Sequence, residues 1–223
     1  KDEKRRTYAA MISSLDVQVG RMVAALEKAK MRENTLILFA SDNGGATSAL
    51  FATGARSPEE RKESGGVELG AKPPASNGDL RGGKGSLHEG GVRVTAFANW
   101  PTKLHPRIVN EPLHMVDVMP TVLVLAGGKG SADKPMDGKD MWAVLAEGKP
   151  SPHEDILINV EVFRGAVRKG NWKLVKIALL PGRTELFDLS KDPGEKTNVA
   201  DQFPEVVREL EARLVGYAKE QKP

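Results

Sequence analysis

The feature that most constrains the fold is an uninterrupted apolar run that ends in a polar, glycine-rich turn. Residues 35–40 read Thr-Leu-Ile-Leu-Phe-Ala, and residues 41–45 read Ser-Asp-Asn-Gly-Gly. A run without alternation suits a strand buried on both faces, as in a parallel sheet, and paired glycines favour a turn. Apolar residues recur every three or four positions over residues 7–30, which predicts an amphipathic helix before this strand. The sequence of helix, buried strand and polar loop indicates an α/β fold, in which ligands bind at the carboxyl ends of strands.

The middle of the chain predicts a long loop followed by short elements. Residues 46–85 are rich in Gly, Pro, Ser and charge, and a loop of this length is often functional. Residues 92–98 predict a strand, and Asp117 is expected to cap a helix over residues 118–126 that Gly127-Gly128 would end. Residues 139–146 predict another short helix.

The pattern changes after Pro150. Short apolar runs alternate there with Gly or Pro turns, which predicts a small antiparallel sheet. Pro204 begins a last helix with an apolar face. We therefore expect an α/β domain over residues 1–150 and a small α+β subdomain over residues 151–223. The strands of the expected sheet fall in residues 155–160, 165–169, 172–177 and 183–189.

Composition excludes several classes of function. The 223 residues include no cysteine, which rules out disulfides, Cys-ligated metals and a cysteine nucleophile within this chain. The net charge is only +3 and aromatic residues are 5% of the chain, so no basic stripe interleaved with aromatics predicts a nucleic-acid partner. No uninterrupted apolar run reaches the ~18 residues of a membrane span, and we expect no membrane partner.

Asp42 and Asn43 are the first candidate site residues. Both carry side-chain oxygens, and both lie where the expected buried strand opens into a loop. Hard cations such as Ca²⁺ and Mg²⁺ bind carboxylate and amide oxygens. The alternative is an ordinary turn, because Asp, Asn and Gly are common turn residues. Two ligands do not complete a Ca²⁺ site, so further ligands would come from elsewhere.

The second candidate is Lys84 within the glycine-rich residues 80–91. A lysine among glycines can approach an anion closely, because few side chains shield it and backbone N–H groups add to the field. The alternative is a merely flexible loop. His88 is the only histidine in a plausible site. We expect His114 to be structural, whereas His105 and His153 lie in loops beside prolines.

Five groups of residues stand out together in their order and spacing: residues 36–45, 80–93, 116–121 with Ala126-Gly127, 185–189, and 192–195 with Asn198. Together they resemble the C-terminal half of a sulfatase, in the alkaline-phosphatase-like superfamily. The resemblance runs from the first helix to the last and implies the C-terminal part of an alkaline-phosphatase-like α/β sandwich with a small antiparallel-sheet-plus-helix subdomain.

The resemblance assigns roles to four residues. Asp42 and Asn43 match the family's pair of Ca²⁺ ligands, and Lys84 matches the lysine that contacts the sulfate oxygens. His88 stands where family members often have an aromatic residue, and we expect it to contact the substrate. The resemblance implies sulfate ester hydrolysis of the arylsulfatase type and favours a periplasmic or secreted location.

The family's nucleophile is a formylglycine made within a Cys/Ser-x-Pro-x-Arg motif, and this chain contains no such motif. The resemblance therefore implies a partner, the missing N-terminal half of the same catalytic domain, and this chain alone is expected to be inactive. Two alternatives stay open: a non-catalytic remnant that binds a metal or an anion, and a phosphodiester or phosphonate hydrolase of the same superfamily.

Overall fold

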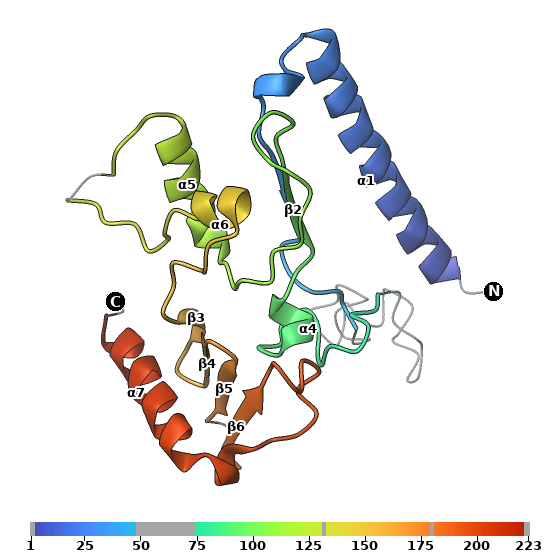
Figure 1. Ribbon diagram of the computed structural model, residues 1–223. Coiled ribbons are helices and arrows are strands. Elements are labelled where there is room, and N and C mark those ends of the chain that lie inside the picture. Colours follow the sequence, from blue (N-terminus) through green and yellow to red (C-terminus); the bar gives the residue numbers. More distant parts are fainter. Residues whose placement is uncertain (1–2, 48–74, 131–132, 179–180, 221–223) are drawn as a thin grey trace. The chain divides into compact units, whose positions relative to one another are not determined.

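The computed structural model describes residues 3–47, 75–130, 133–178 and 181–220 (Figure 1). Most of the long loop expected over residues 46–85 lies outside these described residues. Contacts divide the chain into two units, one of Lys1–Phe97 with Lys191–Thr197 and the other of Ala98–Ser190 with Asn198–Pro223. This division differs from the boundary expected at residue 150, which stays a prediction.

The first unit contains a long helix, a strand, short helical turns and the first half of a second strand. Helix α1 spans Glu3–Lys28 and confirms the predicted amphipathic helix. The 3₁₀ turn η1 (Arg32–Asn34) leads into β1 (Ile37–Ala40), which pairs with β2 (Ala96–Asn99). The rings of Phe39 and Phe97 stack at a centroid distance of 4.9 Å across this pair.

Two expectations for this unit are wrong in detail. β1 is half-buried along its whole length rather than buried on both faces, because β2 is its sole neighbour in the described sheet. The strand expected from residue 92 starts later, because Glu89–Val92 form the helical turn α4. The N–H of Val92 donates to the carbonyl of His88 at 3.2 Å, and this bond keeps residue 92 out of the strand.

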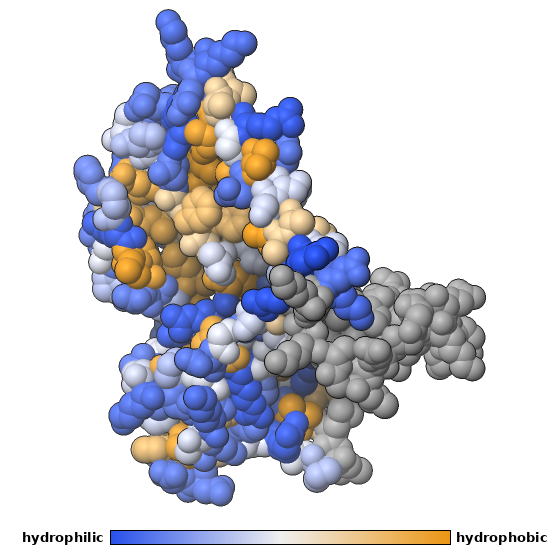
Figure 2. Space-filling model, turned by 90° about the vertical axis from the view of Figure 1, so that its right-hand side faces the viewer, coloured by the Kyte–Doolittle hydropathy of each residue, from blue (hydrophilic) through white to orange (hydrophobic). Residues whose placement is uncertain are grey.

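Helix α1 has no buried side chain within the described residues. Its apolar residues are therefore exposed, including 65% of Met11 and 61% of Met22. Figure 2 shows hydrophobic residues, in orange, lying between hydrophilic ones, in blue, on one face of the protein. By length and composition α1 also passes as a membrane span, although the sequence has no uninterrupted apolar run. Core helices and signal sequences meet the same criteria, so this finding does not identify a membrane segment.

The second unit begins with short helices and continues as an antiparallel sheet. The 3₁₀ turn η2 (Met115–Asp117) leads into α5 (Val118–Leu125), and α6 spans Trp142–Glu147. Gly127, with φ of 77°, follows α5 and ends it as predicted. Four strands in the order β3-β4-β5-β6 form the sheet, as the repeated turns predicted. The remaining elements are β3 (Ile156–Val160), β4 (Arg164–Lys169), β5 (Trp172–Ile177), β6 (Arg183–Asp188), the 3₁₀ turn η3 (Ala200–Gln202) and α7 (Pro204–Glu220).

The core of the second unit lies between this sheet and α7. β4, β5 and β6 each contribute one buried apolar side chain to this core, and α7 covers them with the apolar face that the sequence predicted. Because alternate residues of a strand point to the same face, these side chains meet in one layer. The buried members are Val167, Leu174, Leu186, Leu210 and Leu214.

Polar contacts also fix α7 to the start of the sheet. The Tyr217 hydroxyl donates to Asp155, and the Arg213 guanidinium pairs with the same carboxylate. Burial of the phenol and its hydrogen bond to Asp155 raise the pKa of Tyr217 to about 12. The fold therefore favours the neutral phenol over the phenolate.

This pKa predicts a loss of stability at alkaline pH. A group whose pKa is raised on folding contributes stability below its unfolded pKa, and this contribution falls as pH rises from the ordinary value of 10.0 to about 12. In Tyr217→Phe the free energy of unfolding should therefore depend less on pH within that window. Urea denaturation at several pH values measures the slope, and equal slopes in both proteins would contradict the prediction.

Candidate functional site

The first site loop follows β1 directly and forms a tight turn. The N–H of Asn43 donates to the Asp42 carboxylate at 2.9 Å, and the Ser41 hydroxyl donates to the carbonyl of Asn43 at 2.9 Å. The Asn43 amide donates to the carbonyl of Gly44 at 3.0 Å. The turn geometry weighed as the alternative for these residues is therefore present. The Asp42 side chain is exposed, so the turn leaves it accessible to a ligand.

The second site loop carries Lys84 and contains two residues that need left-handed backbone. Gly82 has φ of 79° and Gly85 has φ of 83°, which glycine adopts without the strain that a Cβ would cause. The N–H of Ser86 donates to the carbonyl of Gly83 at 2.8 Å and closes the turn around the lysine. The loop is thus hydrogen-bonded rather than merely flexible, and the Lys84 side chain is exposed on it.

Backbone hydrogen bonds join the two loops. The N–H of Lys84 donates to the carbonyl of Gly45 at 3.1 Å, and the N–H of Gly44 donates to the carbonyl of Gly91 at 2.9 Å. The structure therefore brings together the segments that carry Asp42, Asn43 and Lys84. No periodicity in the sequence indicates this contact, because the two loops lie about 40 residues apart along the chain.

Close packing of glycines at this junction gives a testable prediction. A Cβ on Gly44 would lie 1.7 Å from the carbonyl oxygen of Gly90, which no rotamer change can relieve. We expect Gly44→Ala to lower the free energy of unfolding by about 3 kcal/mol or more, as for severe overpacking. Gly216→Ala in α7 is the matched control, because a Cβ there meets nothing within 4 Å. Urea denaturation of both variants measures the difference, and equal stabilities would contradict the prediction.

Asn77 bridges the two loops and was missed by the sequence analysis. Its side-chain oxygen accepts the N–H of Gly45 at 2.8 Å, and its amide donates to the carbonyl of Gly82 at 2.9 Å. One side chain therefore satisfies backbone groups of both site loops. The Asn77-Gly78 pair is a turn signal, and within a segment read only as a long loop that signal could have marked an ordered residue.

His88 is buried beneath the second loop, with 9% of its surface exposed. Its Nδ1 lies 3.0 Å from the Ser86 hydroxyl oxygen, which also accepts the N–H of His88 at 3.1 Å. The ring is thus oriented by its own loop. A direct contact between His88 and a substrate stays a prediction.

The donor chemistry of the first loop fits part of a metal site. Asp42 and Asn43 offer carboxylate and amide oxygens, which are the donors that hard cations prefer, whereas Ca²⁺ takes about six to eight oxygens. Within the described ranges, no three His, Cys, Asp or Glu side chains gather as a metal site would require. The loop could therefore supply two ligands of a shell that other residues would complete.

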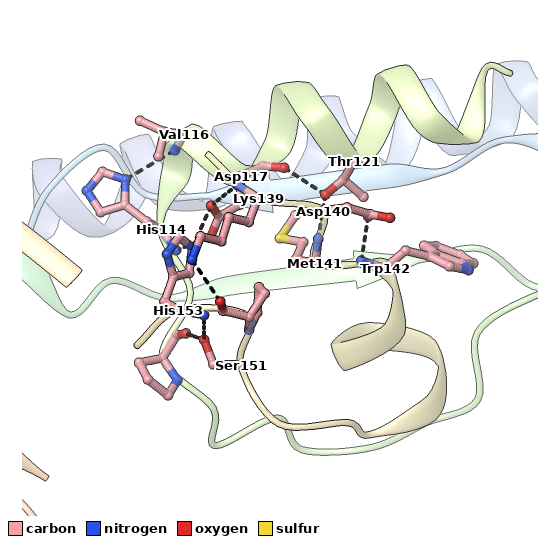
Figure 3. A network of polar contacts seen from close by, with 12 residues as sticks. His114, Val116, Asp117, Thr121, Lys139, Asp140, Met141, Trp142, Ser151 and His153 are labelled. Atoms are coloured by element: carbon pink, nitrogen blue, oxygen red, sulfur yellow. Dashed lines mark hydrogen bonds and ion pairs between the residues drawn. The ribbon is translucent and has the colours of Figure 1, made fainter. Parts of the chain in front are cut away.

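A buried polar network in the second unit surrounds Asp117 (Figure 3). The Asp117 carboxylate has no exposed surface and accepts the N–H of His114 at 2.8 Å and that of Lys139 at 2.9 Å. His153 Nε2 lies 2.8 Å from the same carboxylate. The hydroxyl of Thr121 donates to the Asp117 carbonyl at 2.7 Å and joins the network. Three separate segments of the chain thus meet at one carboxylate.

This network corrects one expectation and confirms two. The Asp117 side chain does not cap α5, because its backbone is already helical with φ of −74°, and it instead closes a capping box with His114 around η2. Side-chain caps need an extended backbone at the cap residue. His114 is structural, as expected. His153 lies in a loop beside Pro152, as expected, but no sequence signal indicated its pairing with Asp117.

Comparison with known proteins identifies two family models. The model described as Sulfatase matches residues 1–128. The model described as N-sulphoglucosamine sulphohydrolase, C-terminal, matches residues 83–220. Both site loops fall in the first match, and the sheet with α7 falls in the second.

Curated relatives and solved structures agree with these matches. Arylsulfatase J of Mus musculus is 28% identical over 263 residues, which cover 96% of this chain and 40% of that protein. Steryl-sulfatase of Mus musculus is 33% identical over 220 residues, which cover 85% of this chain and 33% of that protein. The crystal structure of Ps i-CgsB in complex with k-i-k-neocarrahexaose matches 97% of this chain and 44% of that one, with a TM-score of 0.76 and 27% identity. The chain thus spans less than half the length of these relatives.

Proposed function

The chain belongs to the sulfatase family and has its alkaline-phosphatase-like α/β fold, and from this premise we propose that it is part of a sulfuric ester hydrolase of the arylsulfatase type. The relatives named above are sulfatases, which supports hydrolysis of sulfate esters in general. The observation that carries the proposal is the hydrogen bond between Lys84 N–H and the Gly45 carbonyl. It joins a loop with two oxygen ligands to a loop with an exposed cation.

In this proposal the first loop would hold a divalent cation. Asp42 and Asn43 would supply two of its oxygen ligands, and Ca²⁺, which binds carboxylate and amide oxygens, would be the ion. When bound, such an ion stabilises negative charge on the oxygens of a sulfate group. The exposed position of the Asp42 carboxylate supports this role.

The second loop would bind the sulfate group itself. The Lys84 ammonium would neutralise charge on sulfate oxygens as it redistributes in the transition state, and such fixed charges lower reaction barriers. His88 would line the same site from a buried position, oriented by Ser86. The glycines around Lys84 leave room for an anion to approach the backbone.

The nucleophile would come from outside this chain, as a formylglycine in the N-terminal half of the same catalytic domain. The chain spans 40% of arylsulfatase J, which supports a further half in a complete enzyme. Apolar side chains on α1 and α5 support it too, because exposed apolar patches commonly mark interaction surfaces. The exposed residues include Ile12, Leu15 and Met22 on α1, and Met119, Val122 and Val124 on α5.

An assay on the complete protein tests the proposed function. We expect a protein that joins this chain to a formylglycine-bearing half to hydrolyse aryl sulfates, to lose activity on Ca²⁺ chelation, and to turn over phosphate diesters more slowly. The isolated chain should show no turnover. Preference for a phosphate diester or a phosphonate would favour a phosphoryl hydrolase. Binding of Ca²⁺ and sulfate by calorimetry, without turnover in the complete protein, would indicate a non-catalytic remnant.

A further inference from the structure

Residues 191–197 follow the C-terminal sheet in the sequence but group with the unit that contains both site loops. The segment is a compact turn: the N–H of Glu195 donates to the carbonyl of Asp192 at 3.1 Å, and the N–H of Thr197 donates to the Asp192 carboxylate at 2.8 Å. Gly194 packs so closely that a Cβ there would lie 2.9 Å from the carbonyl oxygen of Asp79. The turn therefore lies directly against the segment that leads into the Lys84 loop.

Glu195 makes the contacts that connect this turn to the site. Its side chain has no exposed surface, and its carboxylate accepts the N–H of Glu89 at 2.5 Å. Its carbonyl accepts a hydrogen bond from Arg81 at 3.2 Å. Arg81 precedes Lys84 by three residues, and Glu89 directly follows His88. A single buried residue thus bonds to both ends of the site loop.

The backbone of Glu195 indicates that this arrangement is specific. Glu195 has φ of 52°, a left-handed conformation that is uncommon for residues other than glycine. Such strain persists only where surrounding contacts determine it, and it concentrates at functional sites. Burial of a carboxylate is also unfavourable unless hydrogen bonds compensate it. An ordinary turn at this position would need neither the strained backbone nor the burial, because an exposed Asn or Gly adopts the left-handed conformation.

We propose that Glu195 is a positioning residue for the sulfate site: it holds both ends of the loop that carries Lys84 and His88. The catalytic consequence of this inference rests on the proposed function. The hydrogen bonds by which Glu195 fixes the loop do not depend on that function. Because reacting groups must be placed to within a fraction of an ångström, displacement of this loop by about 1 Å is expected to lower activity by up to about 10²-fold.

Amide hydrogen exchange measures, without any substrate, how strongly Glu195 protects the backbone of this loop. In Glu195→Ala, exchange in residues 81–92 should become about tenfold faster or more, because a buried N–H loses its acceptor. Glu195→Gln keeps an oxygen at the same reach and should retain most of the protection. Glu195→Asp keeps the carboxyl group on a side chain one methylene shorter, and it should lose protection. Glu205→Ala, at an exposed position of α7, is the matched control and should leave these residues unchanged.

The Gln and Asp variants keep the test decisive if the Ala variant does not fold. Equal protection of residues 81–92 in wild type, Glu195→Gln and Glu195→Asp would contradict the proposal that Glu195 fixes this loop. Faster exchange in the Asp variant alone would support it.

Kinetics in the complete protein test the catalytic consequence. Glu195→Asp should raise KM for an aryl sulfate and lower kcat/KM by about tenfold or more, with near wild-type values in Glu195→Gln. A merely destabilised protein would lose active molecules but keep KM. An unchanged KM in the Asp variant would therefore overturn the positioning role. If the wild-type protein does not hydrolyse sulfate esters at all, the proposed function fails, and the exchange result alone decides whether Glu195 holds the loop.

Discussion

Replacing Lys84 by alanine in the complete enzyme is expected to lower turnover of an aryl sulfate by about 10²-fold or more, the range found for lost oxyanion stabilisers. The Lys84 side chain is exposed, whereas its backbone N–H bonds to Gly45. The substitution therefore removes the cation and leaves the loop junction in place. Steady-state kinetics measure the loss.

The control for this prediction is Lys219→Ala, which removes an exposed lysine from the last turn of α7. It should leave both stability and turnover near the wild-type values. Circular dichroism and urea denaturation should show that Lys84→Ala keeps the fold. Near-normal turnover by a folded Lys84→Ala enzyme would remove Lys84 from the site.

The second large effect concerns stability rather than activity. Asp117→Ala is expected to lower the free energy of unfolding by about 3 kcal/mol, because three hydrogen-bonding groups lose their shared acceptor at about 1 kcal/mol or more each. The substitution leaves the N–H groups of His114 and Lys139 and the ring of His153 without their shared acceptor. Each buried donor without a partner adds a desolvation penalty.

Urea denaturation followed by tryptophan fluorescence measures this loss, because Trp100 and Trp142 lie in the same unit as Asp117. Asp137→Ala removes an exposed carboxylate from a neighbouring segment and should change the unfolding free energy by less than about 0.5 kcal/mol. A loss below about 1 kcal/mol for Asp117→Ala would show that water reaches the freed donors and replaces the carboxylate.

Most of the elements could be predicted from the sequence, because their signals lie within a few neighbouring residues. The spacing of apolar residues predicted α1 and α7, and the turns after Pro150 predicted the four-stranded sheet. Burial was harder to predict than structure. The run at residues 35–40 does form a strand, but its burial depends on which elements flank it, and this information is not local.

At the candidate site, too, residue types could be predicted from the sequence, whereas the contacts between them could not. Residue chemistry pointed to Asp42, Asn43, Lys84 and His88 as ligands of a metal and an anion, and those assignments stay predictions. The structure added the hydrogen bonds that join their loops, and it added Asn77 between them. Asn77 was missed because an asparagine in a glycine-rich segment has the same sequence pattern whether it is exposed or bridges two loops.

What the sequence determined by itself is the set of local structures and the chemical groups available to the site. Helices, hairpins and glycine turns follow from steric limits and from the period of apolar residues, both of which act over one or two turns of chain. The tertiary structure alone decided that Glu195 bonds to Glu89, that His153 pairs with Asp117, and that Gly44 packs on Gly90. Hydrogen bonds and close contacts act at about 3 Å whatever the separation along the chain, so only the folded arrangement selects which distant groups meet.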